Sequence, residues 1–213
     1  MFGGTAINCF WFKNHFEKFV FQMINDIINI QKSYDSEILD SQSLTNKEFE
    51  DCTFQNCNFE NADFSDNTFL DCAFIGCNLS NIIISNCFLK NITFTNCKMI
   101  GINFSSTEDF LFEVKFVECN IDYAIFDRKK LTKTQFQNCS LKETSFINTN
   151  LSYATFENCN FNKAIFENTI LIGADFSTSH HFAIDPEKNT IRKAKFSNDG
   201  ILGLLGKYDI KIV

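Results

Sequence analysis

The sequence lacks the segments that would carry a protein out of the cytoplasm. Residues 1–6 contain no basic residue and no clear cleavage site follows them, so no signal peptide is indicated. The most apolar early stretch, residues 10–30, is interrupted by lysines, asparagines, a histidine and acidic residues, which makes it too polar for a membrane span. We therefore expect a cytoplasmic protein with no membrane segment.

Basic residues are scarce relative to acidic ones. The chain has 19 Lys and Arg against 26 Asp and Glu, a formal net charge of −7. This balance disfavours direct binding to nucleic acid, because affinity for phosphates depends on basic side chains that displace counterions. It favours solubility and a protein partner with a basic surface.

Sequence patterns typical of catalysis or metal binding are also missing. There is no nucleophile–base pairing, no glycine-rich phosphate loop and no HExxH pattern, so we expect no enzymatic activity and no cofactor. The ten cysteines form no CxxC pair and have no nearby histidine, which argues against a zinc site. His180 and His181 are a possible metal pair, but their place at the end of the repeats favours a structural role.

Phenylalanine, in contrast, is abundant: 27 Phe stand against one Trp and four Tyr. From Leu44 to Phe104 a large apolar residue recurs at every fifth position, and a small or weakly polar residue usually lies two positions before it. After the irregular segment Ser105–Phe110 the pattern resumes at Leu111 and Phe116 and continues to Phe196. A period of five fits neither an α-helix nor a flat strand. It predicts a chain that turns at every repeat and packs one large and one small side chain inward.

A longer period of four repeats indicates how the turns are stacked. If the step from Phe104 to Leu111 counts as one repeat with two extra residues, every fourth large residue falls into one column that contains only Phe. That column is Phe54, Phe74, Phe94, Phe116, Phe136, Phe156, Phe176 and Phe196. A second column, at the small inward position, reads Cys57, Cys77, Cys97, Cys119, Cys139 and Cys159. We expect four repeats per coil and about eight coils stacked about 4.8 Å apart, the spacing of neighbouring strands.

The repeats carry a recognisable motif, seen as Ala-Asp-Phe-Ser-Asp at residues 62–66 and Ala-Asp-Phe-Ser-Thr at residues 174–178. On this motif the chain resembles the pentapeptide-repeat family. Its tail, Ile-Asp-Pro-Glu-Lys-Asn at residues 184–189 with the expected short helix and apolar strand after it, is similar to that of McbG and more loosely to those of Qnr and MfpA, the topoisomerase-protection group. The resemblance implies an all-β, right-handed quadrilateral β-helix. It further implies an acidic rod that mimics DNA, binds DNA gyrase or topoisomerase IV, and confers immunity to a toxin or to quinolones. The alternative is a pentapeptide-repeat scaffold that binds some other protein.

The chain is predicted to divide into three parts. Residues 44–197 form the β-helix, and residues 1–43 form an N-terminal extension with amphipathic helical spacing over residues 12–32, either a cap or translated upstream sequence with Met23 as the start. Residues 198–213 form a C-terminal cap, with a short helix begun by Asn198 and Asp199 and a strand at residues 210–213. As in relatives that dimerise through this region, we expect a homodimer. Its predicted contacts are Leu202, Leu205, Ile210 and Ile212.

Acidic residues cluster at residues 48–71 and 108–127, and these clusters are the candidate partner-binding surface. The residues selected are Asp51, Asp71, Glu108, Asp109 and Glu113. Asp51, Asp71 and Glu113 share one column at the edge of the coil. A solvated face without a partner is the alternative. At Arg128–Lys130 the repeat places Lys129 in a small inward position, which favours a locally bulged coil over a phosphate site.

Overall fold

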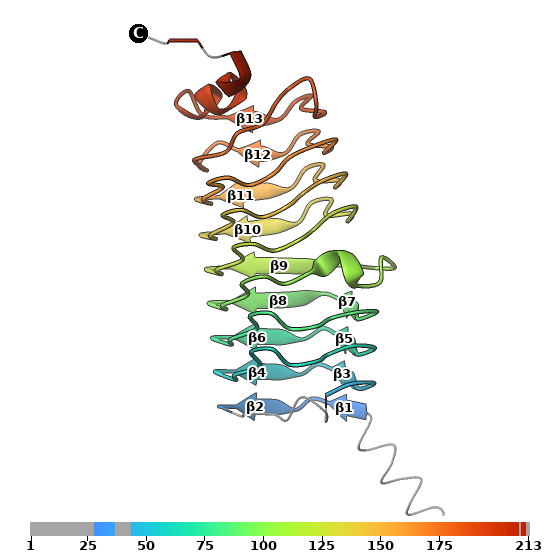
Figure 1. Ribbon diagram of the computed structural model, residues 1–213. Helices are drawn as coiled ribbons and strands as arrows, with labels where there is room; N and C mark the ends of the chain where they lie inside the picture. The colour runs from blue at the N-terminus through green and yellow to red at the C-terminus, as the bar shows by residue number, and fades with distance from the viewer. Residues whose placement is uncertain (1–27, 37–43, 209, 212–213) are drawn as a thin grey trace, which may run out of the picture.

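The computed structural model describes residues 28–36, 44–208 and 210–211, which form a rod of stacked coils (Figure 1). Each coil takes about 20 residues, and successive coils pair in parallel along the rod. The fold class predicted from the repeats, a four-sided β-helix, is therefore confirmed. In the described part, no helix has both the length and the apolar composition needed to cross a bilayer.

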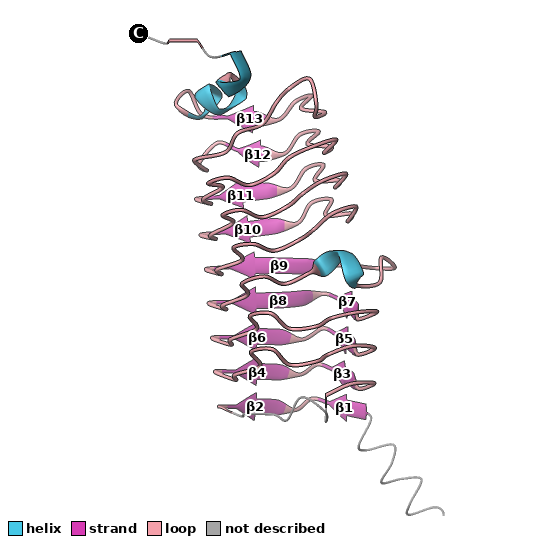
Figure 2. Ribbon diagram, in the orientation of Figure 1, coloured by secondary structure: helices cyan, strands magenta, loops and turns pink. Residues whose placement is uncertain are grey.

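Two sheets of short parallel strands line two sides of the rod, and isolated bridges such as Asn58 with Asn78 join the coils elsewhere (Figure 2). The first sheet contains β1 (Ile28–Ile30), β3 (Glu48–Glu50), β5 (Thr68–Leu70) and β7 (Phe88–Lys90). The second contains β2 (Ser33–Asp35), β4 (Thr53–Gln55), β6 (Ala73–Ile75), β8 (Ile92–Thr95), β9 (Val114–Val117), β10 (Gln135–Gln137), β11 (Thr155–Glu157), β12 (Asp175–Phe176) and β13 (Lys195–Phe196).

Stacked phenylalanine rings fill the centre of the rod. In the all-Phe column, neighbouring rings from Phe54 to Phe196 lie 4.6–5.5 Å apart between centroids, close to parallel. The Sγ atoms of the inward cysteines lie near backbone carbonyls, as Cys77 does at 3.3 Å from the oxygen of Phe54. The corners of the coil adopt positive φ, and Asn and Asp, which tolerate this region better than other residues with a side chain, are the commonest residues there. The inward positions favour Phe and Cys, and the corners favour Asn and Asp. These two demands account for the residue types of the repeat.

Three sequence expectations need correction. Ser33–Asp35 pairs with β4, and Ile28–Ile30 is strand β1, paired with β3, so the coils begin before Leu44 and the expected helix does not extend to residue 32. The helical expectation for residues 12–27 lies outside the described residues. Leu111 is half exposed rather than inward, and the partly buried Phe112 packs against the core instead.

The C-terminal cap also differs in detail. Two 3₁₀ turns, η3 (Gly200–Leu204) and η4 (Gly206–Tyr208), replace the expected single helix. Ser197 caps the first turn, because its Oγ accepts a hydrogen bond from the amide of Gly200 at 2.9 Å, whereas the Asp199 side chain makes no cap bond. Ile210 and Lys211 are not in a strand, and residues 212–213 lie outside the described part.

Candidate partner-binding surface

The one two-residue insertion among the described coils creates a loop on the side of the rod. The coil first tightens into the 3₁₀ turn η2 (Phe104–Ser106), where the Asn103 side chain accepts hydrogen bonds from the amide and hydroxyl of Ser105. The chain then leaves the coil and returns at β9 (Figure 1). Two backbone bonds hold the base of the loop, from the amide of Glu108 to the carbonyl of Cys87 and from the amide of Glu113 to that of Leu89.

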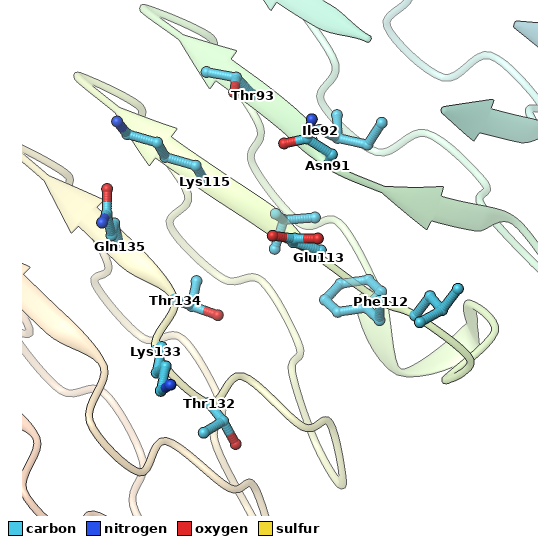
Figure 3. A pocket seen from close by; sticks show the side chains of 12 residues that line it. Asn91, Ile92, Thr93, Phe112, Glu113, Lys115, Thr132, Lys133, Thr134 and Gln135 are labelled. Atoms are coloured by element: carbon cyan, nitrogen blue, oxygen red, sulfur yellow. The ribbon is translucent and has the colours of Figure 1, made fainter. Parts of the chain in front are cut away.

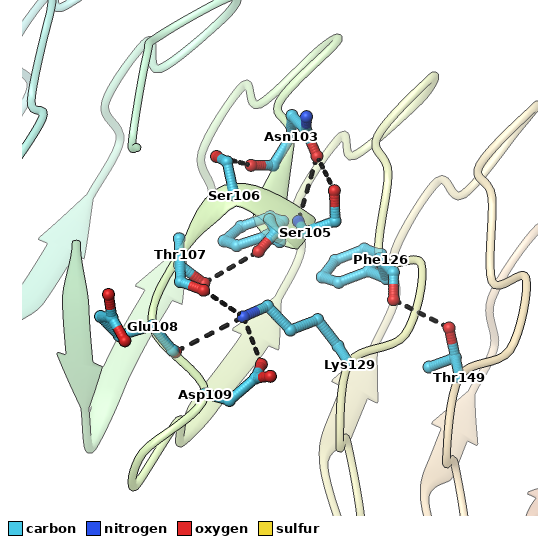
Figure 4. A network of polar contacts seen from close by, with 10 residues as sticks. Asn103, Ser105, Ser106, Thr107, Glu108, Asp109, Phe126, Lys129 and Thr149 are labelled. Atoms are coloured by element: carbon cyan, nitrogen blue, oxygen red, sulfur yellow. Dashed lines mark hydrogen bonds and ion pairs between the residues drawn. The ribbon is translucent and has the colours of Figure 1, made fainter. Parts of the chain in front are cut away.

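A buried lysine anchors this loop from the coil above (Figure 4). The Lys129 side chain is 2% exposed, and its Nζ donates to the carbonyl of Thr107 at 2.6 Å and to Oδ1 of Asp109 at 2.7 Å. It also lies 3.4 Å from the carbonyl of Glu108 and 4.9 Å from the centroid of the Phe112 ring. Three oxygens and an aromatic face together compensate the buried charge.

The expectation of a bulged coil at Arg128–Lys130 is therefore wrong. The amide of Lys129 bonds to the carbonyl of Phe126, and the carbonyl of Lys129 accepts from the amide of Asn150, as in the regular coils. The lysine replaces the usual small inward residue because the loop below supplies the acceptors. The irregularity lies in the loop, and Lys129 donates the hydrogen bonds that the oxygens of the loop accept.

The predicted acidic residues do not form one cluster. Asp51 and Asp71 occupy equivalent positive-φ corners of successive coils, and both are exposed. The next residue of that column is Asn91, which donates to Oδ1 of Asp71 at 2.6 Å, and the pairing of β8 with β9 places Glu113 above Asn91. Glu108 and Asp109 belong to the loop, and Asp109 is paired with Lys129. Within the described residues, no ion pair involves Asp51, Asp71, Glu108 or Glu113.

The acidic edge is confined to the N-terminal half of the rod. Residues 44–127 contain 13 acidic and four basic residues, whereas residues 128–211 contain eight acidic and 12 basic residues. The corner column changes accordingly from Asp51 and Asp71 to Lys133 and Lys193. The negative charge that would attract a basic surface is therefore on the half that carries the loop.

A recess of about 470 Å³ lies beside the loop, where Glu113, Lys115, Thr132 and Lys133 are among the lining residues (Figure 3). The recess forms because the inserted coil lacks the regular corner. Its positive-φ residue is Leu111, whereas Glu113, at the corner position of the column, does not adopt positive φ. The space between the corners of Asn91 and Lys133 is thus left unfilled. Charges of both signs line the recess, so its chemistry alone does not single out a ligand class.

Sequence reasoning missed the apolar part of this region. Phe110 is 70% exposed and Leu111 51% exposed, and the ring of Phe110 lies 6.1 Å from that of Phe88, which is partly buried. Phe110 falls between two registers of the repeat, and that mismatch was the one available signal. Because Phe110 and Leu111 are consecutive, they form a small contiguous apolar patch, and contiguous patches are what distinguish binding surfaces from scattered exposed residues.

The residues expected at a dimer contact are only partly described. Leu202 is 50% exposed and Ile210 56% exposed, Leu205 is partly buried, and Ile212 lies outside the described residues. The ammonium of Lys207 bridges Asp185 and Glu187 at 2.8 Å each, and these pairs hold the cap on the last coil. The ion pairs of Lys207 therefore hold the cap in place, while the side chains of Leu202 and Ile210 remain exposed.

No group of three or more metal-ligating side chains occurs in the described part of the chain. The rings of His180 and His181 lie 4.7 Å apart, and desolvation together with the neighbouring His181 lowers the pKa of His180. The nine described cysteines are free and buried. Burial raises the pKa of Cys72 and of Cys87 to about 12, so these thiols are not poised for reaction.

Two family models match the sequence, "Pentapeptide repeat region" over residues 47–126 and "Pentapeptide repeats (8 copies)" over residues 139–177. Together they span more than half of the chain and agree with the observed coils. The chain belongs to the pentapeptide-repeat family. No curated protein matches the sequence significantly.

Solved pentapeptide-repeat structures are similar at low identity. A trypsin-treated form of QnrB1, a plasmid-mediated fluoroquinolone resistance protein, is 21% identical with a TM-score of 0.48, over 87% of this chain and 100% of that one. HetL from Nostoc sp. strain PCC 7120, involved in heterocyst differentiation regulation, is 14% identical with a TM-score of 0.40, over 81% and 84%. Rfr23 from Cyanothece 51142 is 19% identical with a TM-score of 0.24, over 50% and 88%. At this identity the likeness concerns the fold.

Proposed function

We propose that this pentapeptide-repeat protein acts by binding a protein partner through the acidic edge of its N-terminal half, and that the partner is DNA gyrase or topoisomerase IV. In this proposal the rod occupies the basic groove that holds DNA and protects the enzyme from a toxin or a quinolone. The protein acts in the cytoplasm, without a catalytic step of its own.

The observation that carries the proposal is the row of Asp51 and Asp71, continued after Asn91 by Glu113. These carboxylates are exposed and lie in one column of the coil register, with Asn91 between Asp71 and Glu113. Adjacent coils are spaced about 4.8 Å apart, as paired strands are, which is of the same order as the roughly 3.4 Å between charges along one DNA strand. A straight rod with exposed carboxylates along one edge, none of them in an ion pair within the described part of the chain, fits a basic groove better than it fits a concave pocket.

A second candidate is a scaffold that binds a different basic protein and never contacts a topoisomerase. The observation that favours it is the basic character of residues 128–211, which limits the phosphate-like edge to half of the rod. A dimer joined through the C-termini would place the two basic halves next to each other. The acidic edges would then lie at the two ends of the assembly.

Purified gyrase tests both candidates. We expect binding that weakens steeply with salt and competes with linear DNA, as charge-steered association does. The triple variant Asp51→Asn, Asp71→Asn, Glu113→Gln should remain folded, because all three side chains are exposed, and should bind at least tenfold more weakly. A control removes the same number of charges outside this edge, by changing Glu143, Glu157 and Glu167 to Gln. Equal effects of both sets would mean that only total charge matters, and absence of binding by the parent protein would favour the scaffold.

A further inference from the structure

We propose that Lys129 is a positioning residue for a preformed apolar docking element, made by Phe110 and Leu111 at the loop tip with Phe88 beneath them. The inference rests on the proposed function, because it assigns the element to the same partner. It adds an apolar contact with a rigid base to a surface that was otherwise defined by charge.

The first step concerns the loop tip. Phe110 and Leu111, two consecutive large apolar side chains, are both more than half exposed. The insertion that brings them to the surface adds only two residues to the coil. The Phe110 ring contacts that of Phe88 with centroids 6.1 Å apart and an interplanar angle of 39°, and this contact restricts its orientation on one side. An aromatic side chain that is already ordered loses little conformational entropy on binding, and such residues dominate interface energies.

The second step concerns the base of the loop. Lys129 reaches 20 to 22 residues back along the chain, to the coil below, and gathers Thr107, Glu108 and Asp109 on one ammonium group (Figure 4). Its acceptors lie immediately before Phe110, and the ring of Phe112, immediately after the tip, faces the same ammonium. Lys129 thus contacts both arms of the loop. Without it, the carbonyl of Thr107 and the ring of Phe112 would border an empty inward position.

Asp109 is exposed, but its contact with Lys129 makes it part of the loop's anchor rather than a free surface charge. One oxygen of Asp109 binds Lys129, and although the side chain is 75% exposed its charge is already compensated. Glu108 and Glu113, which flank the tip and form no ion pair among the described residues, retain their charge for a partner. The partner chemistry is therefore an apolar pocket with a basic rim.

The positioning role has a test that needs no partner. Hydrogen exchange of the full-length chain should show that Lys129→Met speeds exchange of the Glu108 and Glu113 amides at least tenfold, while amides of β9 and β10 remain protected. Lys129→Arg should restore most of the protection, because it keeps a donor and the charge. The control is Lys133→Met, an exposed lysine four residues further on with no ion pair in the described part.

If Lys129→Met unfolds the rod, Asp109→Asn, which leaves the buried residues in place, should give a smaller rise in exchange confined to the loop. Unchanged loop exchange in both variants would overturn the positioning role.

The docking role is measured with gyrase. Phe110→Ala should lower affinity at least tenfold with loop exchange unchanged, and Lys129→Met should lower it mainly through slower association. Ile165→Ala, which removes an exposed apolar side chain at a regular outward position, should have little effect. If the parent protein binds gyrase and loses affinity in the acidic triple variant but not in Phe110→Ala, the docking element is refuted and the proposed function stands. If the parent does not bind, the proposed function fails and the docking role fails with it, while exchange still decides the role of Lys129.

Discussion

The rings of Phe94 and Phe116 stack with centroids 5.3 Å apart and planes 10° from parallel, although the chain between them carries the inserted loop. Ile92, Thr93, Phe94 and Thr95 pair in register with residues 114–117. The insertion is therefore absorbed entirely on the neighbouring side of the coil. The phenylalanine column therefore continues through this coil, and no gap exposes the rings of the coils above and below.

Phe116 is accordingly expected to be one of the most sensitive positions for stability. It is fully buried and stacks on both Phe94 and Phe136, so Phe116→Ala should lower the free energy of unfolding by about 3–5 kcal/mol, as large core deletions do. Urea denaturation followed by circular dichroism measures the change. Phe110→Ala, only a few residues away but exposed, is the control and should change stability little. A similar loss in both variants would contradict the assignment of Phe110 to the surface.

The coil, its period and its inward residues could be predicted from the sequence because they repeat. Phe116 and Cys119 were placed above Phe94 and Cys97 by spacing alone, and the structure confirms both placements. A repeat makes each position subject to the same steric demand, so many copies average out local exceptions. The same spacing predicted Leu111 to point inward, and this was wrong because the insertion shifts the register: Leu111 is half exposed and Phe112 packs against the core.

The loop and its anchor could not be predicted for that reason. Lys129 departs from the small-residue pattern, and the sequence offered no means of pairing it with acceptors some 20 residues earlier in an irregular segment. The start of the coils was also hidden, because Tyr34 occupies the position where later coils have Phe. Its ring stacks on Phe54 at 4.9 Å. The acidic edge was predictable as a pattern, but the pairing of Asp109 was not.

The cysteines should be inert in the native protein. Nine are buried, so a reagent cannot reach them while the coils are intact; for Cys72 and Cys87, burial also raises the pKa to about 12. Titration with a thiol reagent at pH 8 should label few sites before denaturation and about ten after it, in line with the ten cysteines of the sequence. Fast labelling of several native thiols, or disulfides in protein kept under reducing conditions, would contradict this expectation.

Two glycines of the C-terminal cap form a matched pair. A Cβ at Gly203 would lie 2.3 Å from the backbone oxygen of Phe182, whereas one at Gly206 would have no atom within 4 Å. The amide of Ile184 donates to the carbonyl of Gly203, so close approach of the two segments is required. Gly203→Ala should displace the cap and make it susceptible to limited proteolysis, and Gly206→Ala should not. Equal resistance of the two variants would show that the cap tolerates the shift.

The cap also carries the predicted dimer contact. Leu202 and Ile210 are half exposed or more, and a two-fold pair would bury both with their counterparts, since symmetric dimers are the commonest assembly. Replacing Leu202 and Leu205 with Glu should therefore give a soluble monomer by analytical ultracentrifugation, while the parent sediments as a dimer at micromolar concentration. Lys211→Glu, a charge change of similar size beside the same cap, is the control and should leave the dimer in place. Because Leu205 is partly buried, circular dichroism must show that the double variant keeps its coils. A parent protein that sediments as a monomer would refute the dimer, and the acidic edge would then act from a single rod.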